Sequence, residues 1–266
     1  MVAELQTFFF RESERALFGC FHPPKTTPAR ATVVVCQPHH HEYVRAHRAV
    51  RQLSEHLAHA GYAVLRFDFY GNGDSDGTSE DGSLGQWLAD VPAAIEEGRA
   101  RSGSPRVCLI GVRLGATVAC LTAAREHSAQ ALVMWDPIVR GADYLKELAT
   151  GEQDRRRAVP SWARASSQNG EHVEYIGFAY SPRLLQEIRA VDLADTDPRV
   201  ERTLLVRTEV SGNGGGPSER WLERLPRLQQ RTVSTPRMWA TDAEGLVLAP
   251  PVLLDVIQTW LREAMP

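Results

Sequence analysis

Short apolar runs alternate with longer segments of helical periodicity along most of this 266-residue chain. Each run is too short to form a helix and is apolar throughout, so both of its faces must be buried. Such strands, alternating with helices, are typical of a parallel sheet that helices cover on both sides. The expected strands are 32–36, 62–67, 107–110 and 131–135, and the expected helices are 46–60, 84–100 and 114–126.

The two ends of the chain extend this pattern, and one central segment interrupts it. Two extended segments, 5–10 and 16–22, flank a charged turn and predict an N-terminal hairpin. Between 136 and 197 the alternation lapses, which predicts an insertion with a helix-like 144–149, a polar stretch around Trp162 and an extended 173–180. Towards the C-terminus we expect a strand at 203–206, a loop at 212–216, a helix at 218–230, a strand at 232–239 and a helix at 252–264.

Charge and hydropathy exclude several classes of partner. The formal net charge is −3 and no basic block occurs, so we expect no nucleic-acid partner. No stretch approaches the roughly 20 apolar residues that cross a bilayer, and the start has no positive n-region, so we expect no membrane span and a cytoplasmic location. The four cysteines form no CxxC pair, and neither glycine-rich stretch has phosphate-loop spacing, so we expect no metal and no cofactor.

Two glycine-containing patterns directly follow expected strands. One runs from Asp68 to Ser75 and reads D-F-Y-G-N-G-D-S, and the other runs from Gly111 to Gly115 and reads G-V-R-L-G. The second lies between a strand and a helix, which is the context of the G-x-S-x-G nucleophile elbow. Its two glycines and Ala116 remain because helix and strand approach closely there.

With Pro251 and the apolar helix after it, these patterns resemble the α/β-hydrolase fold over nearly the whole chain. The resemblance implies a mostly parallel central sheet with helices on both faces and an inserted lid. The expected divisions are a core at 1–139, a lid at 140–200 and the rest of the core at 201–266. Within the superfamily, residues 35–52, 65–77 and 109–119 look most similar to bacterial hydrolase-like proteins associated with exosortase systems.

The sequence departs from the family at two of its three triad positions. The triad runs Ser, then Asp or Glu, then His in chain order. Residue 113 is Arg, and no histidine follows His172. A guanidinium carries only donors and stays protonated, so it cannot act as the nucleophile. We therefore expect negligible hydrolysis by the inherited mechanism, since loss of triad members lowers turnover by about 10⁴- to 10⁶-fold.

Two interpretations of Arg113 stay open from the sequence. The start of the next helix favours negative charge, so Arg113 is a candidate anchor for an anionic ligand. Alternatively it fills the old site as one half of an internal ion pair. Asp136, which follows a strand where some family members have the triad acid, is then the preferred partner, with Asp68, Asp242 and Glu244 as the others. Glu209, which follows the expected strand 203–206, lies at the other position where family members commonly have the triad acid.

The run His39-His40-His41-Glu42 follows the strand 32–36, where the resemblance places the oxyanion loop. These histidines are candidates to polarise a carbonyl or to carry a proton near pH 7, although the run also fits a solvated loop. Cys36 beside them is a candidate nucleophile with His40 as base, or a buried thiol. The expected catalytic set is Arg113, His39, His40 and Asp136, and the expected substrate-binding set is Arg113, Leu114, His41, Glu42 and Tyr70.

Three functions follow, in order of preference. The first is a non-hydrolytic protein that binds an acyl or carboxylate-bearing small molecule under the lid, with a cyclisation or lyase step as its candidate chemistry. The second is a catalytically silent accessory protein that acts through a protein partner. The third is a hydrolase or acyltransferase with a relocated nucleophile, which requires a Cys or Ser within reach of His39 or His40.

Overall fold

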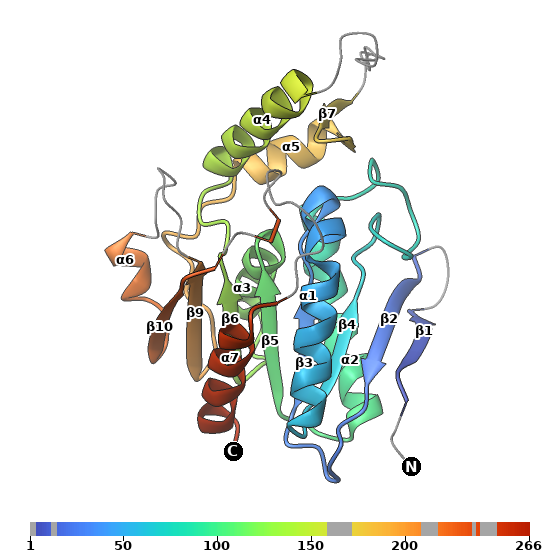
Figure 1. Cartoon of the computed structure of the whole chain (residues 1–266), viewed down its shortest axis with the longest axis vertical. Coiled ribbons are helices and arrows are strands. Elements are labelled where there is room, and N and C mark those ends of the chain that lie inside the picture. The colour runs from blue at the N-terminus through green and yellow to red at the C-terminus, as the bar shows by residue number, and fades with distance from the viewer. Residues whose placement is uncertain (1–3, 12–14, 159–171, 209–217, 236–237, 240–248) are drawn as a thin grey trace.

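The fold is seen in a computed structural model (Figure 1), which describes residues 4–11, 15–158, 172–208, 218–235, 238–239 and 249–266. Eight strands form one sheet in the order β1-β2-β4-β3-β5-β6-β9-β10. β2 pairs antiparallel with β1 and β4, and the other neighbours pair in parallel. The strands are β1 (Gln6–Phe10), β2 (Leu17–His22), β3 (Thr32–Cys36), β4 (Ala63–Phe67), β5 (Val107–Val112), β6 (Ala131–Trp135), β9 (Arg202–Thr208) and β10 (Leu228–Val233).

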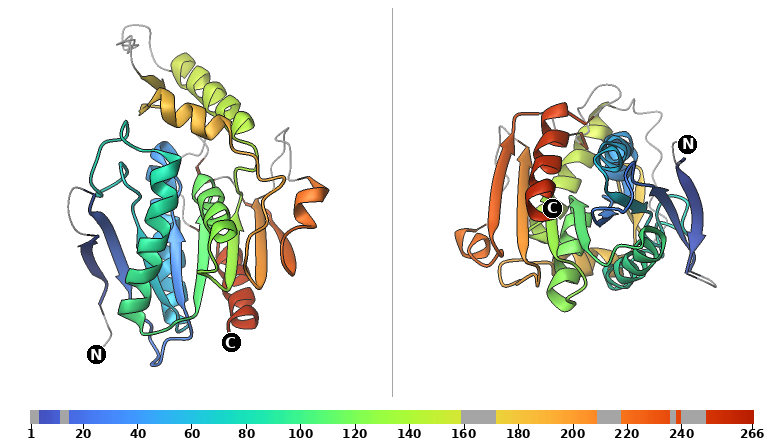
Figure 2. Two further views of the ribbon diagram at one scale, coloured as in Figure 1. Left: turned by 180° about the vertical axis from the view of Figure 1, so that it is seen from behind. Right: turned by 90° about the horizontal axis from the view of Figure 1, so that it is seen from below.

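Helices cover both faces of this sheet, as the alternating pattern predicted. α1 (His40–His59) and α7 (Pro251–Ala264) lie on one face, and α2 (Leu84–Ser102) and α3 (Leu114–Arg125) lie on the other (Figures 1 and 2). Each face has its own apolar core, because alternate side chains of a strand point to opposite sides. The α/β-hydrolase fold expected from the sequence is therefore confirmed.

The segment between β6 and β9 contributes no strand to the main sheet among its described residues. It contains α4 (Gly141–Ala158), the small hairpin β7 (Val173–Tyr175) and β8 (Phe178–Tyr180), and α5 (Pro182–Arg189). Figure 1 shows these elements beyond one end of the main sheet, above the start of α1. Trp162 lies outside the described residues.

Several predicted boundaries were wrong; among them, the strand expected at 232–239 lies at 228–233. α1 begins at His40 rather than near residue 46, because its first turn is buried and carries no apolar periodicity. The helix expected at 218–230 is only α6 (Glu219–Leu222), and 228–233 is a strand rather than the helix end. Pro226 lies between the two elements, and a proline in a helix interior removes a hydrogen bond and clashes with the preceding turn.

Candidate functional site

The turn between β5 and α3 places Arg113 just beyond the carboxyl end of β5, a central strand of the sheet. Arg113 has φ 53° and ψ −122°, and its N–H donates to the carbonyl of Trp135 at 2.9 Å. A Cβ on Gly111 would overlap the backbone of Ala116, and one on Gly115 would overlap the carbonyl oxygens of Cys36 and Gln37. The strand–turn–helix context predicted for residues 111–115 is thus confirmed, and its close packing is the reason for both glycines.

The guanidinium of Arg113 is held between two carboxylates from different elements. Its Nε donates to Oε1 of Glu42 at 2.7 Å, and Nη2 donates to Oε2 of Glu147 at 2.8 Å. The Tyr144 hydroxyl donates to the other oxygen of Glu42 at 3.2 Å. α1 supplies Glu42, whereas α4 supplies Tyr144 and Glu147. Arg113 therefore joins the central sheet to α1 and to the inserted segment.

Aromatic rings complete the surroundings of the guanidinium. Its Cζ lies 5.2 Å from the ring centroid of Trp239 and 5.6 Å from that of Tyr144. Both distances are within the range in which a cation is attracted to a ring. Trp239 and Tyr144 are themselves buried, so these contacts are shielded from water.

Burial and charge oppose each other in this cluster. Burial disfavours the charged form of Arg113, but the facing carboxylates of Glu42 and Glu147 raise its pKa, so it stays a cation. Burial raises the pKa of Glu42, and the charge of Arg113 opposes that rise. We assign both partners as ionised because the 2.7 Å contact has the length of a charge-assisted hydrogen bond. One cation then faces two anions, which leaves the cluster with an excess of negative charge.

The four predicted residues 39–42 do not form a solvated loop. His39 is the N-cap of α1, and the other three residues form its first turn. The His39 ring lies flat on Trp87 at 3.8 Å between centroids and contacts the amide of Asn72, and His40 stacks on Tyr180 at 4.4 Å. All four residues are buried.

The predicted role of these histidines as proton carriers near pH 7 is not supported. Burial lowers the pKa of His40 and of His41 to about 4, and burial lowers the pKa of His39 well below its ordinary value. A neutral ring in a closed environment cannot gain a proton at neutral pH. His39 and His40 serve as packed aromatic rings that anchor the start of α1 and the hairpin of the inserted segment.

Asp136 does not form the ion pair with Arg113 that the sequence favoured. Its carboxylate accepts from the backbone N–H of Thr208 at 3.1 Å and from the hydroxyl of the same residue. Within the described residues, the ion-pair partners of Arg113 are Glu42 and Glu147. The two side chains extend in different directions. The Asp136 carboxylate points to Thr208 of β9, whereas the Arg113 guanidinium extends towards α1 and α4.

The other predicted partners of Arg113 are placed elsewhere or fall outside the description. Asp68 is buried and accepts from Gln37 at 2.7 Å and from Tyr43 at 3.1 Å. Asp242, Glu244 and Glu209 lie outside the described residues.

The remaining candidates have structural contacts. Leu114 is buried, and Tyr70 is positioned through its backbone by Trp87 and Asp90. Cys36 is buried and burial raises its thiol pKa, which favours the interpretation as an unreactive thiol. The Ser75 hydroxyl accepts from the N–H of Phe18 and donates to the carbonyl of Asp68, so it ties the loop after β4 to β2. Among the described residues there is no group of three His, Cys, Asp or Glu side chains arranged to hold a metal ion.

Glu147, Tyr144 and Trp239 were not predicted from the sequence. Tyr144 and Glu147 are three residues apart on α4, so they share one helix face. That spacing was visible in the sequence, but nothing indicated that this face points at residue 113.

In the described part of the chain no helix is long and apolar enough to cross a bilayer.

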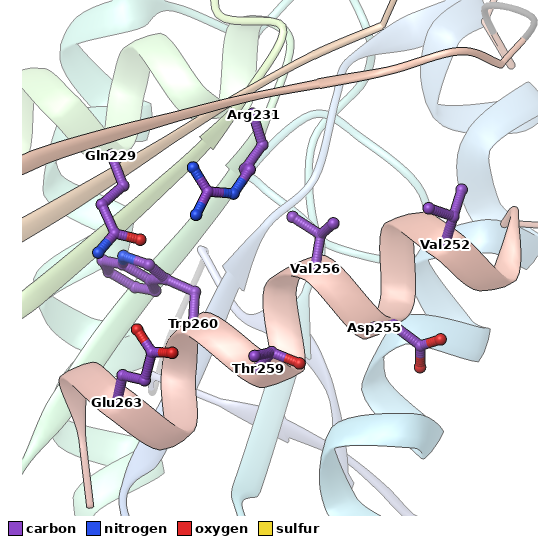
Figure 3. Close-up of a pocket in the computed structure, with 8 residues that line it drawn as sticks. All are labelled: Gln229, Arg231, Val252, Asp255, Val256, Thr259, Trp260 and Glu263. Atoms are coloured by element: carbon purple, nitrogen blue, oxygen red, sulfur yellow. The ribbon is translucent and has the colours of Figure 1, made fainter.

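A groove of about 240 Å³ lies between β10 and α7 (Figure 3). Gln229 and Arg231 project into it from the strand, and Asp255, Trp260 and Glu263 line it from the helix. None of the residues that line it contacts Arg113 in the ion-pair cluster. The groove is therefore separate from that cluster.

Comparison with known proteins agrees with this architecture. The model of the Hydrolase_4 family, described as serine aminopeptidase S33, matches residues 27–211, which is more than half of the chain. Two relatives are the mitochondrial palmitoyl-protein thioesterases ABHD10 of Homo sapiens and Pongo abelii, each 31% identical over 91 residues. That match covers 34% of this chain and 28% of either relative, so this chain spans under a third of their length.

Solved structures show the same fold at low sequence identity. Est1E from Butyrivibrio proteoclasticus, solved with ferulic acid bound, has a TM-score of 0.67 and 17% identity, and the likeness covers 97% of this chain and 98% of that one. An esterase from Pyrococcus furiosus has a TM-score of 0.68 and 16% identity, with 99% and 92% covered. These likenesses extend over nearly the whole of each chain.

Proposed function

The chain belongs to the serine aminopeptidase S33 family of α/β hydrolases, and we propose that it binds an acyl or carboxylate-bearing small molecule at Arg113 without hydrolysing it. The observation that carries this proposal is the guanidinium at the strand–helix turn, where the fold would hold its serine nucleophile. A guanidinium has no lone pair to attack a carbonyl, but it is well suited to hold a carboxylate.

The general base is missing as well as the nucleophile. No histidine follows His172 in the sequence, although the triad histidine of this fold comes last in the chain. Among the described residues, Asn72 is the side chain that hydrogen-bonds to the His39 ring, and no hydrogen bond joins the His39 or His40 ring to a Ser or Cys side chain. A relocated nucleophile therefore has no support in the described contacts, and the packed rings give no support to a cyclisation or lyase step.

The inserted segment acts as a lid over this site. We place the lid at residues 140–200, between core segments 1–139 and 201–266. Its support is the contact of α4 with Arg113 through Glu147 and the stack of Tyr180 on His40. An association with exosortase systems, on the strength of the sequence resemblance alone, and a cytoplasmic location, which the lack of a long apolar stretch favours, complete this proposal.

A second candidate function is a silent accessory protein that acts through a protein partner. The pairing of Arg113 with two carboxylates favours it, because a guanidinium already satisfied inside the protein needs no ligand. The two candidates differ in whether added carboxylates bind at residue 113.

The test has one arm for hydrolysis and one for binding. A fluorophosphonate probe should leave the protein unlabelled, because labelling needs a serine activated by a base. Hexanoate should raise the melting temperature of the wild type and should not raise that of Arg113→Gln. Stoichiometric labelling of any serine would overturn the loss of hydrolysis. Equal stabilisation of both proteins, or of neither, would overturn binding at Arg113, and the latter result would favour the accessory role.

A further inference from the structure

The two carboxylates on Arg113 differ sharply in their contact with water. The side chain of Glu42 is 2% exposed, whereas that of Glu147 is 42% exposed. Glu42 also accepts from the Tyr144 hydroxyl through its second oxygen. Glu42 is therefore a built-in part of the site, and Glu147 reaches the guanidinium from its solvent side.

The two contacts also use different nitrogens of the guanidinium. Glu42 takes Nε, close to the backbone of the turn, and Glu147 takes Nη2, at the outer end of the side chain. An outer guanidinium nitrogen is the position at which a carboxylate from outside the protein would be held. Glu147 thus occupies the outer anion position of the site.

We propose that Glu147 is an internal stand-in for the ligand carboxylate, and that a monocarboxylate ligand binds by displacing it from Nη2 of Arg113. This inference rests on the proposed function and adds the class of ligand and the way it enters. The ligand is a small acid with one ionised carboxylate, and it binds at a guanidinium that the rings of Trp239 and Tyr144 flank.

Charge balance is the reason that the ligand must be an acid. Exchange of one carboxylate for another keeps two anions in contact with the guanidinium, and the displaced Glu147 carboxylate is solvated outside the cluster. A neutral amide or ester would displace Glu147 without replacing its charge on the guanidinium, and would lose the charge-assisted hydrogen bond. Glu147 leaves the guanidinium more readily than Glu42 would, because its side chain is already partly solvated.

The exchange leaves other links between the lid and the core in place. The Tyr144 hydroxyl still donates to Glu42, and Tyr180 still stacks on His40. Only the side chain of Glu147 has to move, so the helix that carries it keeps its position on the core.

Calorimetric titration of the whole protein with hexanoate tests the exchange, with hexanamide as the neutral probe. Glu147→Gln removes the competing charge and keeps the side-chain size. Asp143→Asn is the matched control, since it removes one charge from the same helix at a residue that pairs with Lys146 and Arg140 instead. We expect Glu147→Gln to bind hexanoate about fivefold more tightly than the wild type, the effect of a partly exposed ion pair.

The remaining outcomes separate the inference from the function on which it rests. Asp143→Asn should bind hexanoate as the wild type does, and hexanamide should bind to none of the variants. Unchanged or weaker binding by Glu147→Gln, or an equal gain in Asp143→Asn, would overturn the role of Glu147 while binding at Arg113 stands. Hexanoate binding by neither wild type nor Glu147→Gln would overturn the proposed function itself.

Discussion

At the scale of single residues, Arg113 is held by partners that are far apart in the chain. Glu42 is 71 residues away and Glu147 is 34 residues away. Such a buried pair contributes little compared with an apolar cluster of equal volume, but removal of one partner is costly because the other charge stays behind without compensation. Most of the lost stability would come from Glu42, because its carboxylate is almost fully buried.

We expect Arg113→Met to lower the free energy of unfolding by about 3 kcal/mol or more, because it leaves the Glu42 carboxylate without its cation. Urea denaturation at pH 7 measures the change. Arg51→Met is the control, since Arg51 forms an exposed pair with Glu55 and should cost less than about 1 kcal/mol. The double variant Arg113→Met, Glu42→Gln should regain part of the loss. Similar stabilities of the two single variants would contradict a structural role of the buried pair.

A serine at residue 113 should not by itself give ester hydrolysis. We expect Arg113→Ser to hydrolyse p-nitrophenyl butyrate no faster than buffer. The sequence has no histidine after His172, and burial lowers the pKa of His41, the ring near residue 113, to about 4. Initial rates of p-nitrophenol release give the result, with the wild type as the control. Turnover above buffer in the single variant would mean that a histidine reaches the turn, and the account of the missing base would be wrong.

At the scale of elements, the turn between β5 and α3 depends on close backbone contact. The start of α3 packs against the end of β3, and a side chain at Gly115 would meet carbonyl oxygens of β3 and the residue after it. Backbone atoms cannot move aside as the end of a flexible side chain can. The positive φ of Arg113 is therefore fixed by the packing of two elements rather than by the residue itself.

Gly115→Ala should destabilise the protein by at least about 2 kcal/mol, since overpacking against backbone forces the helix away from the strand. Gly85→Ala is the matched control, because a Cβ there would have only the Arg183 guanidinium near it, at 4.0 Å. That change should be about neutral, given the better helix propensity of alanine. Thermal and urea unfolding of both variants measures the difference, and equal melting temperatures would refute the close approach.

At the scale of the whole molecule, folding takes several histidines out of water. Burial, with Arg66 as a second cause, lowers the pKa of His22 to about 4, and burial does the same for His40 and His41. The unfolded chain takes up these protons near pH 6.5, whereas the folded protein does so only near pH 4. Stability is therefore highest above pH 6.5 and falls as the pH drops through this window.

We expect the free energy of unfolding to be at least about 3 kcal/mol lower at pH 5 than at pH 7, since each such histidine contributes about 1.4 kcal/mol per pH unit. Urea titrations at a series of pH values measure the slope. His22→Asn should reduce the slope by about one proton, and a change at the exposed His127 should leave it unaltered. A flat profile from pH 7 to 5 would show that the rings titrate normally in the folded state.

Sequence alone determined the central sheet, both layers of helices and the turn at Gly111–Gly115. These features follow from local patterns: apolar runs of strand length, helical spacing, and glycines where backbones approach closely. The sequence also singled out Arg113 within that turn. The helix expected at 218–230 was wrong, because this segment has helix-compatible residues on both sides of Pro226.

Only the tertiary structure decided what Arg113 contacts. The sequence favoured Asp136, which ends the neighbouring strand, but a guanidinium on a long side chain selects partners by direction rather than by strand order. Helix α1 presents Glu42 and helix α4 presents Glu147. The burial of His39 and His40 was decided in the same way, because the rings of Trp87 and Tyr180 from distant segments stack on them. Local patterns specify which elements form, whereas pairing and burial depend on how those elements meet.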